Sequence, residues 1–113
     1  MRLVGRRRVK ELEFSDGSRP FTEWFSGLRD VTAKVKIRRA LDRIEINGHF
    51  GDVEMLGDGV YEMRFHFGPG YRIYFGLKGR DLLLLVMGGD KSTQSKDIKK
   101  AKALWSLYES EQD

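Results

Sequence analysis

Residues 61–104 read YEMRFHFGPGYRIYFGLKGRDLLLLVMGGDKSTQSKDIKKAKAL, and the first half of this stretch alternates between apolar and polar side chains. The alternation covers residues 60–67 and 71–78, on either side of a Gly-Pro-Gly turn. An apolar residue at every second position is typical of a strand with one buried face. We therefore predict a β-hairpin that contributes one face to the core. The residues expected on that face are Tyr61, Met63, Phe65, Phe67, Tyr71, Ile73, Phe75 and Leu77.

The opposite face of the same hairpin is mainly polar and cationic. It carries Arg64, His66, Arg72, Tyr74 and Lys78. We expect these side chains to be accessible to solvent. A strand face with several cations suits a polyanion such as nucleic acid.

The rest of the sheet is predicted from the segments on either side of the hairpin. Residues 82–87, LLLLVM, do not alternate, which indicates a strand buried on both faces in the middle of a sheet. A first strand within residues 4–14 is expected to pair with its free side, and a short strand at 53–56 precedes the hairpin. The residues Gly88-Gly89-Asp90-Lys91 are expected to end the central strand.

Three segments have helical spacing of apolar residues. Residues 20–28 begin with Pro20, which favours a first helical position. Residues 30–46 have Asp30 as N-cap, and Asn47-Gly48 follow as a stop. Ser92 or Thr93 can cap a last helix. The predicted buried stripes are Ala33, Ile37, Ala40, Leu41 and Ile44 in the second helix, and Ile98, Ala101, Leu104, Trp105 and Tyr108 in the last. The order β-α-α-β-β-β-β-α predicts an α+β fold with helices packed on a mainly antiparallel sheet.

Composition narrows the class of protein. The 113 residues (1–113) are expected to form a single domain. The chain has no cysteine and two histidines, which leaves neither a disulfide framework nor a metal site to predict. The apolar run 82–87 is far shorter than the ~20 residues of a membrane helix, and the start lacks an apolar signal core. We expect a cytoplasmic protein without membrane association.

Charge is distributed unevenly along the chain. The net charge is +4, and residues 2–10 contain five Lys or Arg and no acid. Segregated positive charge favours a surface that faces a polyanion, although a solvated basic arm remains an alternative. The cations of the second predicted helix, Lys34, Lys36, Arg38, Arg39 and Arg43, are likewise either solvated or in contact with phosphates.

Three blocks of the sequence resemble one known family: LGDGVYEMRF at 56–65, GPGYRIYF at 68–75 and GGDKSTQSKDIKKAKALW at 88–105. With the helix PFTEWFSGL at 20–28, they resemble the RelE/ParE superfamily of bacterial type II toxins. The similarity is greatest to the HigB-like, phage-derived "addiction module killer" branch. The resemblance implies a RelE-like fold: a small twisted antiparallel sheet with an N-terminal helix hairpin and a C-terminal helix.

The same resemblance implies a function. RelE- and HigB-like members are mRNA interferases, which are ribosome-dependent endoribonucleases that inhibit translation without metal or cofactor. They are held inactive by a cognate antitoxin, commonly a helix-turn-helix protein. Two alternatives stay open, because fold does not fix activity: a ParE-like poison of DNA gyrase with no catalysis of its own, and a degenerate, non-catalytic binding module.

Candidate catalytic residues follow from the chemistry of metal-free RNA cleavage. The 2′-hydroxyl attacks the adjacent phosphate, which requires a base, an acid and cations at the phosphorane. Arg64 and Arg72 match the strand arginines of the family and suit phosphate clamping. Lys91 matches the lysine after the GGD turn and is expected to bind phosphate or transfer a proton. His66 is the candidate for proton transfer, since histidine ordinarily titrates near neutrality.

Further residues are predicted to bind RNA. Tyr74 is expected either to stack on a base or to lie under the last helix, and Lys78, Arg80 and Lys96 add positive charge. Structural alternatives remain for each site residue, including an ion pair between Arg64 and Glu62. The chain also departs from RelE itself, whose catalytic tyrosine lies in a C-terminal segment. Here Tyr108 is spaced to lie on the buried stripe of the last helix.

Overall fold

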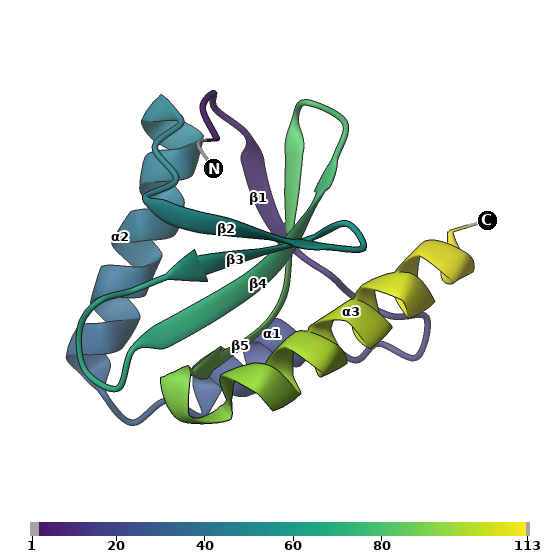
Figure 1. Ribbon diagram of the computed structural model, residues 1–113. Coiled ribbons are helices and arrows are strands. Elements are labelled where there is room, and N and C mark those ends of the chain that lie inside the picture. Colours follow the sequence, from purple (N-terminus) through teal and green to yellow (C-terminus); the bar gives the residue numbers. More distant parts are fainter. Residues whose placement is uncertain (1–2, 113) are drawn as a thin grey trace.

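The computed structural model describes residues 3–112 (Figure 1). Its elements are β1 (Arg8–Glu11), α1 (Pro20–Ser26), α2 (Val31–Asn47), β2 (Asp52–Gly57), β3 (Val60–Arg64), β4 (Tyr71–Lys78), β5 (Leu82–Asp90), a 3₁₀ turn (Lys91–Thr93) and α3 (Gln94–Glu111). This confirms the predicted α+β class and the predicted order of helices and strands. None of the described helices is long and apolar enough to cross a membrane.

The five strands form one sheet in the order β1-β5-β4-β3-β2. β5 pairs in parallel with β1 and antiparallel with β4, so the apolar run is central and its neighbour is the N-terminal strand, as predicted. β5 ends at Asp90, inside the predicted Gly88-Gly89-Asp90-Lys91 segment, and so runs three residues past position 87, where the predicted strand stopped. Both glycines pair with β4, and a Cβ at either position would overlap Trp24 or Asp97. These glycines admit neighbouring side chains and do not break the strand.

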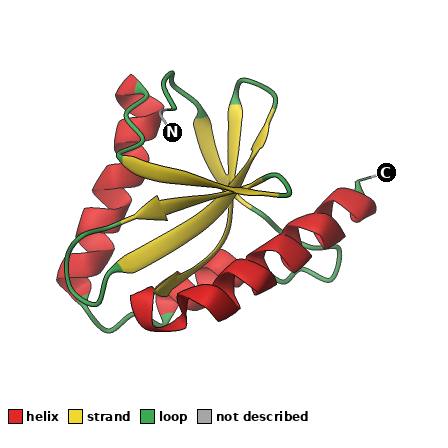
Figure 2. Ribbon diagram, in the orientation of Figure 1, coloured by secondary structure: helices red, strands yellow, loops and turns green. Residues whose placement is uncertain are grey.

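Helices cover both faces of the sheet, with α1 and α2 on one side and α3 on the other (Figure 2). The face toward α1 and α2 carries the predicted core residues of the hairpin. Met63, Ile73 and Phe75 are buried there against Ile37, and the remaining hairpin residues are packed against this cluster. β3 ends at Arg64 rather than at the predicted position 67. Phe65 N–H still donates to Tyr71 O of β4 at 2.9 Å, and the pairing stops before Gly68-Pro69-Gly70.

α2 follows its predicted capping. The Asp30 carboxylate accepts a hydrogen bond from the Ala33 N–H at 3.0 Å, and Gly48 adopts the left-handed conformation with φ 73°. An αL residue after the last turn satisfies terminal carbonyls, and Gly48 N–H donates to Ile44 O at 3.0 Å. Four residues of the predicted stripe are buried: Ala33, Ile37, Leu41 and Ile44.

α3 covers the sheet face that was expected to be exposed to solvent. Tyr74 is 0% exposed and Arg72 7%, so the prediction of solvent access is wrong for both. The physical reason is the apolar stripe of α3, in which Ala101 and Trp105 are buried in one cluster with Val60 and Val86 of the sheet. Trp105 lies directly over Gly76, where a side chain would overlap its ring.

Candidate functional site

The predicted catalytic residues gather at the end of the sheet where the β3–β4 turn meets the start of α3. Arg64 and Arg72 lie directly opposite each other on β3 and β4, which confirms that the hairpin makes their strands neighbours. Arg72 is buried, and its Nη1 donates to the carbonyls of Gly70 and Tyr71 at 3.0 and 3.3 Å. The backbone of the turn therefore fixes the position of its guanidinium.

Glu62 is a fully buried carboxylate in this cluster. Its Oε1 accepts a hydrogen bond from Arg64 Nε at 2.8 Å, and its Oε2 accepts one from Gln94 Nε2 at 2.9 Å. The hydrogen bond from Arg64 to Glu62 raises the pKa of Arg64. Glu62 thus links β3 to the first turn of α3 and holds one edge of the Arg64 guanidinium. The ion pair considered as a structural alternative is present.

Two polar atoms in the cluster are buried without a hydrogen-bond partner among residues 3–112: Arg72 Nε and the Tyr74 hydroxyl. Burial raises the pKa of the Tyr74 phenol, and the nearby Glu62 carboxylate raises it further. Tyr74 stays neutral over the ordinary pH range. Because α3 covers its ring, a base reaches Tyr74 only if that helix moves.

Lys91 lies beside Arg72 at the β3–β4 turn. A Cβ placed on Gly70 would lie 3.3 Å from Lys91 Cβ and 3.4 Å from Arg72 Nη1, so both side chains pack against the same glycine. Lys91 is exposed, and its N–H points to Pro69 O at 3.4 Å. The structure thus brings Lys91 and Arg72 together beside Gly70, whose φ of 77° favours glycine.

His66 lies on the loop that follows β3, and its side chain is 70% exposed. Its Nε2 lies 2.6 Å from Asp52 Oδ2, and Asp52 is itself opposite Arg64 in the β2–β3 pairing. Sequence reasoning missed Asp52 and Gln94. Asp52 precedes the predicted strand at 53–56, and its contact with His66 depends on the register of two strands.

The predicted RNA-binding residues divide between the two ends of the sheet. Lys96 is exposed in the first turns of α3, at the same end as Lys91. Lys78 and Arg80 lie at the far end of β4, about 20 Å away by the rise of a strand. Lys78 Nζ is 5.7 Å from the ring centroids of Trp105 and Tyr108, so its stem covers α3. The structure does not bring Lys78 and Arg80 to the arginine cluster.

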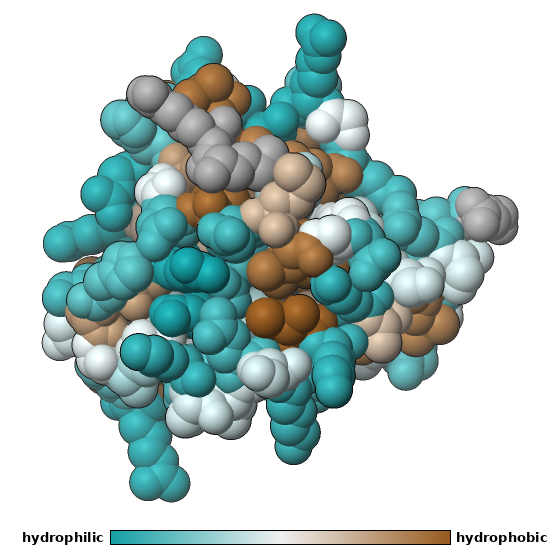
Figure 3. All heavy atoms as spheres, in the orientation of Figure 1, coloured by the Kyte–Doolittle hydropathy of each residue, from teal (hydrophilic) through white to brown (hydrophobic). Residues whose placement is uncertain are grey.

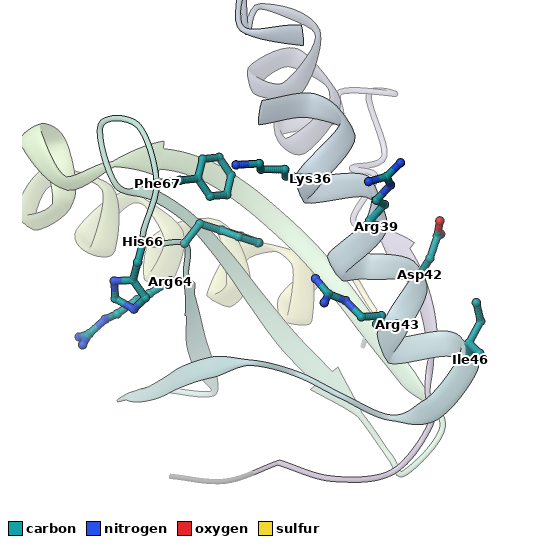
Figure 4. Close-up of a pocket in the computed structure, with 9 residues that line it drawn as sticks. Lys36, Arg39, Asp42, Arg43, Ile46, Arg64, His66 and Phe67 are labelled. Carbon is teal, nitrogen blue, oxygen red and sulfur yellow. The ribbon is translucent and has the colours of Figure 1, made fainter. Parts of the chain in front are cut away.

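A groove of about 720 Å³ lies between α2 and the end of β3 (Figure 4). Its lining includes Arg64 and His66 together with three cations of α2 that sequence analysis did not separate from an ordinary solvated helix face: Lys36, Arg39 and Arg43. The face of the molecule drawn in Figure 3 is mostly hydrophilic, with separate apolar patches. Within residues 3–112 no group of three or more His, Asp or Glu is arranged to hold a metal ion.

Residues 23–106 match the family described as "Phage derived protein Gp49-like (DUF891)". An uncharacterized protein of Haemophilus influenzae is 45% identical over 84 residues, which are 74% of this chain and 84% of that relative. No solved structure matches the chain, and its relation to the RelE/ParE superfamily stays a prediction. The matched region contains every site residue described above, and the chain belongs to the phage-derived Gp49-like family.

Proposed function

We propose that this protein is the toxin of a type II toxin–antitoxin system and that it cleaves mRNA at the ribosome without a metal ion. The observation that carries the proposal is the group of Arg64, Arg72 and Lys91 at one end of the sheet. Membership of a phage-derived family associated with toxin–antitoxin systems supports the toxin assignment. A cognate helix-turn-helix antitoxin is the proposed partner.

The two arginines and Lys91 are assigned to the phosphate. Arg64 uses Nε for Glu62, which leaves its terminal nitrogens for the scissile phosphate. Arg72 is fixed by backbone carbonyls, and Lys91 adds a charge beside it. Cations held in place before the reaction stabilise the negative charge that grows on the phosphorane at no cost of reorganisation.

His66 and Lys91 are assigned to proton transfer. With Nε2 of His66 directed to Asp52, its Nδ1 is free to accept the proton of the 2′-hydroxyl nucleophile. The contact with Asp52 selects this tautomer and orients the ring. Lys91 then donates a proton to the departing 5′-oxygen. Attack of the 2′-oxygen forms a cyclic phosphate, and the P–O5′ bond breaks.

The test is primer extension on host mRNA after the protein is induced. Discrete cuts within translated codons are expected. Arg72→Ala is expected to reduce cleavage by about a hundred- to thousandfold, the usual loss for one donor that acts on transition-state charge. Arg19→Ala removes an exposed arginine that pairs with the exposed Glu13, and this variant serves as the control.

Other outcomes would replace this proposal. Double-strand breaks and an SOS response without mRNA cuts would indicate a gyrase poison. Absence of both effects, with normal growth, would indicate a non-catalytic binding module. Circular dichroism of Arg72→Ala separates loss of function from loss of fold, which is needed because Arg72 is buried.

A further inference from the structure

We infer that the groove between α2 and the end of β3 binds single-stranded RNA and leads it to Arg64. This inference rests on the proposed function, since it names where the RNA substrate lies before cleavage. The groove has a volume typical of sites for small organic ligands, so one or two nucleotides fit within it.

The charge of the groove suits a phosphate backbone. Lys36, Arg39 and Arg43 lie three and four positions apart and therefore occupy one face of α2. Among residues 3–112, no carboxylate lies within 4.0 Å of any of these three cations. The lining has one acid, Asp42, against four permanent cations when Arg64 is included. Cations without a carboxylate partner at the wall of a concave site are available to an anion.

The floor of the groove offers an aromatic surface. Phe67 is partly exposed, and its ring lies 5.9 Å from that of Phe65 in an edge-on arrangement. Lys36 Nζ lies 4.6 Å from the centroid of the Phe67 ring, and Figure 4 shows the two side chains directed toward each other. Because Lys36 covers this face of the ring, a base stacks on Phe67 when Lys36 turns from the ring to the phosphate, and proteins hold unpaired bases by this pairing of an aromatic ring with a cation.

The position of the groove connects it to the proposed site of cleavage. Figure 4 shows Arg43 extending from α2 toward β3, while Arg64 and His66 leave β3 in the other direction. Arg64 and His66 are among the lining residues, so the groove reaches the end of β3 from which both side chains leave. An RNA strand that follows the α2 cations and stacks on Phe67 passes around the end of β3 to bring its next phosphate to the Arg64 guanidinium, which lies beside Glu62.

Binding is tested with a short, fluorescently labelled single-stranded RNA whose 2′-hydroxyls are methylated, which prevents cleavage. Arg39→Ala/Arg43→Ala is expected to bind at least tenfold more weakly in fluorescence anisotropy. Its slope of log affinity against log salt should fall by about 1.4, because each phosphate contact on a single strand contributes about 0.7. Lys99→Ala/Lys100→Ala removes the same charge from exposed positions of α3 and should leave affinity and slope near those of the wild type.

Phe67 is tested separately, since stacking and charge have different salt signatures. Phe67→Ala is expected to weaken binding about tenfold, as loss of one stacked base does, while the salt slope stays unchanged. Phe67→Tyr keeps an aromatic face and should retain affinity. If Phe67→Ala and the double arginine variant both bind RNA like the wild type, the groove is not the RNA site.

Two further outcomes separate this inference from the proposed function. If the wild type cuts mRNA in cells and the groove variants cut and bind equally well, the inference fails and the function stands. If RNA binding depends on the groove but induction gives no cuts, the function fails and the RNA-binding surface stands. A double arginine variant that keeps RNA affinity but loses its antitoxin would overturn the inference in favour of a protein-binding groove.

Discussion

The two faces of the sheet are buried by different means. The face toward α1 and α2 is closed by a continuous apolar cluster around Ile37, Met63 and Phe75. The face toward α3 is apolar near Trp105, but at the start of that helix it encloses Glu62 and Arg72. Burial of charged groups contributes less to stability than apolar packing does. Buried charged residues in place of apolar packing at this end of the sheet are typical of a functional site.

The largest expected effect is on the apolar face. Leu41→Ala removes a buried side chain of α2 and should lower the free energy of unfolding by about 2–5 kcal/mol. Chemical denaturation measures the change. Val35→Ala, at a more exposed position of the same helix, is the control and should change stability by about 0.5 kcal/mol or less. An unchanged midpoint for Leu41→Ala would mean that α2 does not build the core.

The second prediction concerns the ion pair between Arg64 and Glu62 at the polar end of the α3 face. Arg64→Ala leaves the Glu62 carboxylate buried without its charged partner and should cost about 2–4 kcal/mol. This cost is smaller than that of a fully buried pair because the Arg64 side chain is 31% exposed and solvent screens part of the interaction. Adding Glu62→Gln removes the buried charge and should restore much of the loss in urea unfolding.

The same pair of variants separates stability from activity. Glu62→Gln/Arg64→Ala should be folded yet inactive in mRNA cleavage, because the phosphate contact is still missing. A single Arg64→Ala variant as stable as the wild type would show that Glu62 finds another partner when Arg64 is absent.

The third prediction places one substitution on each face. A Cβ at Gly76 would overlap Trp105 below α3, and a Cβ at Gly88 would overlap Trp24 of α1. Gly76→Ala and Gly88→Ala should each cost about 1–3 kcal/mol through overpacking. Adding Trp24→Leu should reduce the cost of Gly88→Ala, and a thermal melt of the double variant tests this. Strictly additive losses would contradict the contact.

The smallest expected effect is the loss of a helix cap, compared between the N-termini of α2 and α3. Asp30→Ala removes the side chain that caps α2 and should cost about 1 kcal/mol. Thr93 precedes α3 without a capping hydrogen bond, and its hydroxyl donates to Asp97 at 2.5 Å. Thr93→Ala should therefore cost less than Asp30→Ala in parallel denaturation curves. A larger loss of stability for Thr93→Ala than for Asp30→Ala would show that α3 has the stronger cap.

Local patterns predicted the elements, and long-range packing decided the rest. Alternation along the hairpin predicted β4 and the neighbouring positions of Arg64 and Arg72, because period two and a short turn are local properties. The sequence left open whether Tyr74 stacks on a base or lies under the last helix, since that depends on how a helix docks on the sheet. In the structure α3 covers it. Glu62 meets Gln94 across 32 positions of the chain, which no local pattern records.

The glycines and the α2 cations were misjudged for a related reason. Gly88 and Gly89 are common strand breakers in isolation, but here they accommodate Trp24 and Asp97. Arg39 and Arg43 have the spacing of any solvated helix face, and only the tertiary structure places them at the wall of a groove. Contacts made by distant elements give these residues their roles.

The parallel pairing of β1 with β5 has a consequence for the order of folding. Arg8 pairs with Leu82, so the partner of the first strand lies 74 positions later in the chain. Closing so long a loop loses chain entropy before any contact between the two strands forms, and this slows the pairing of β1 with β5. During synthesis, β2, β3 and β4 can associate as neighbours while β4 still presents an open edge. The nascent chain depends on β5 to cover that edge, and β1 docks only after β5 is in place.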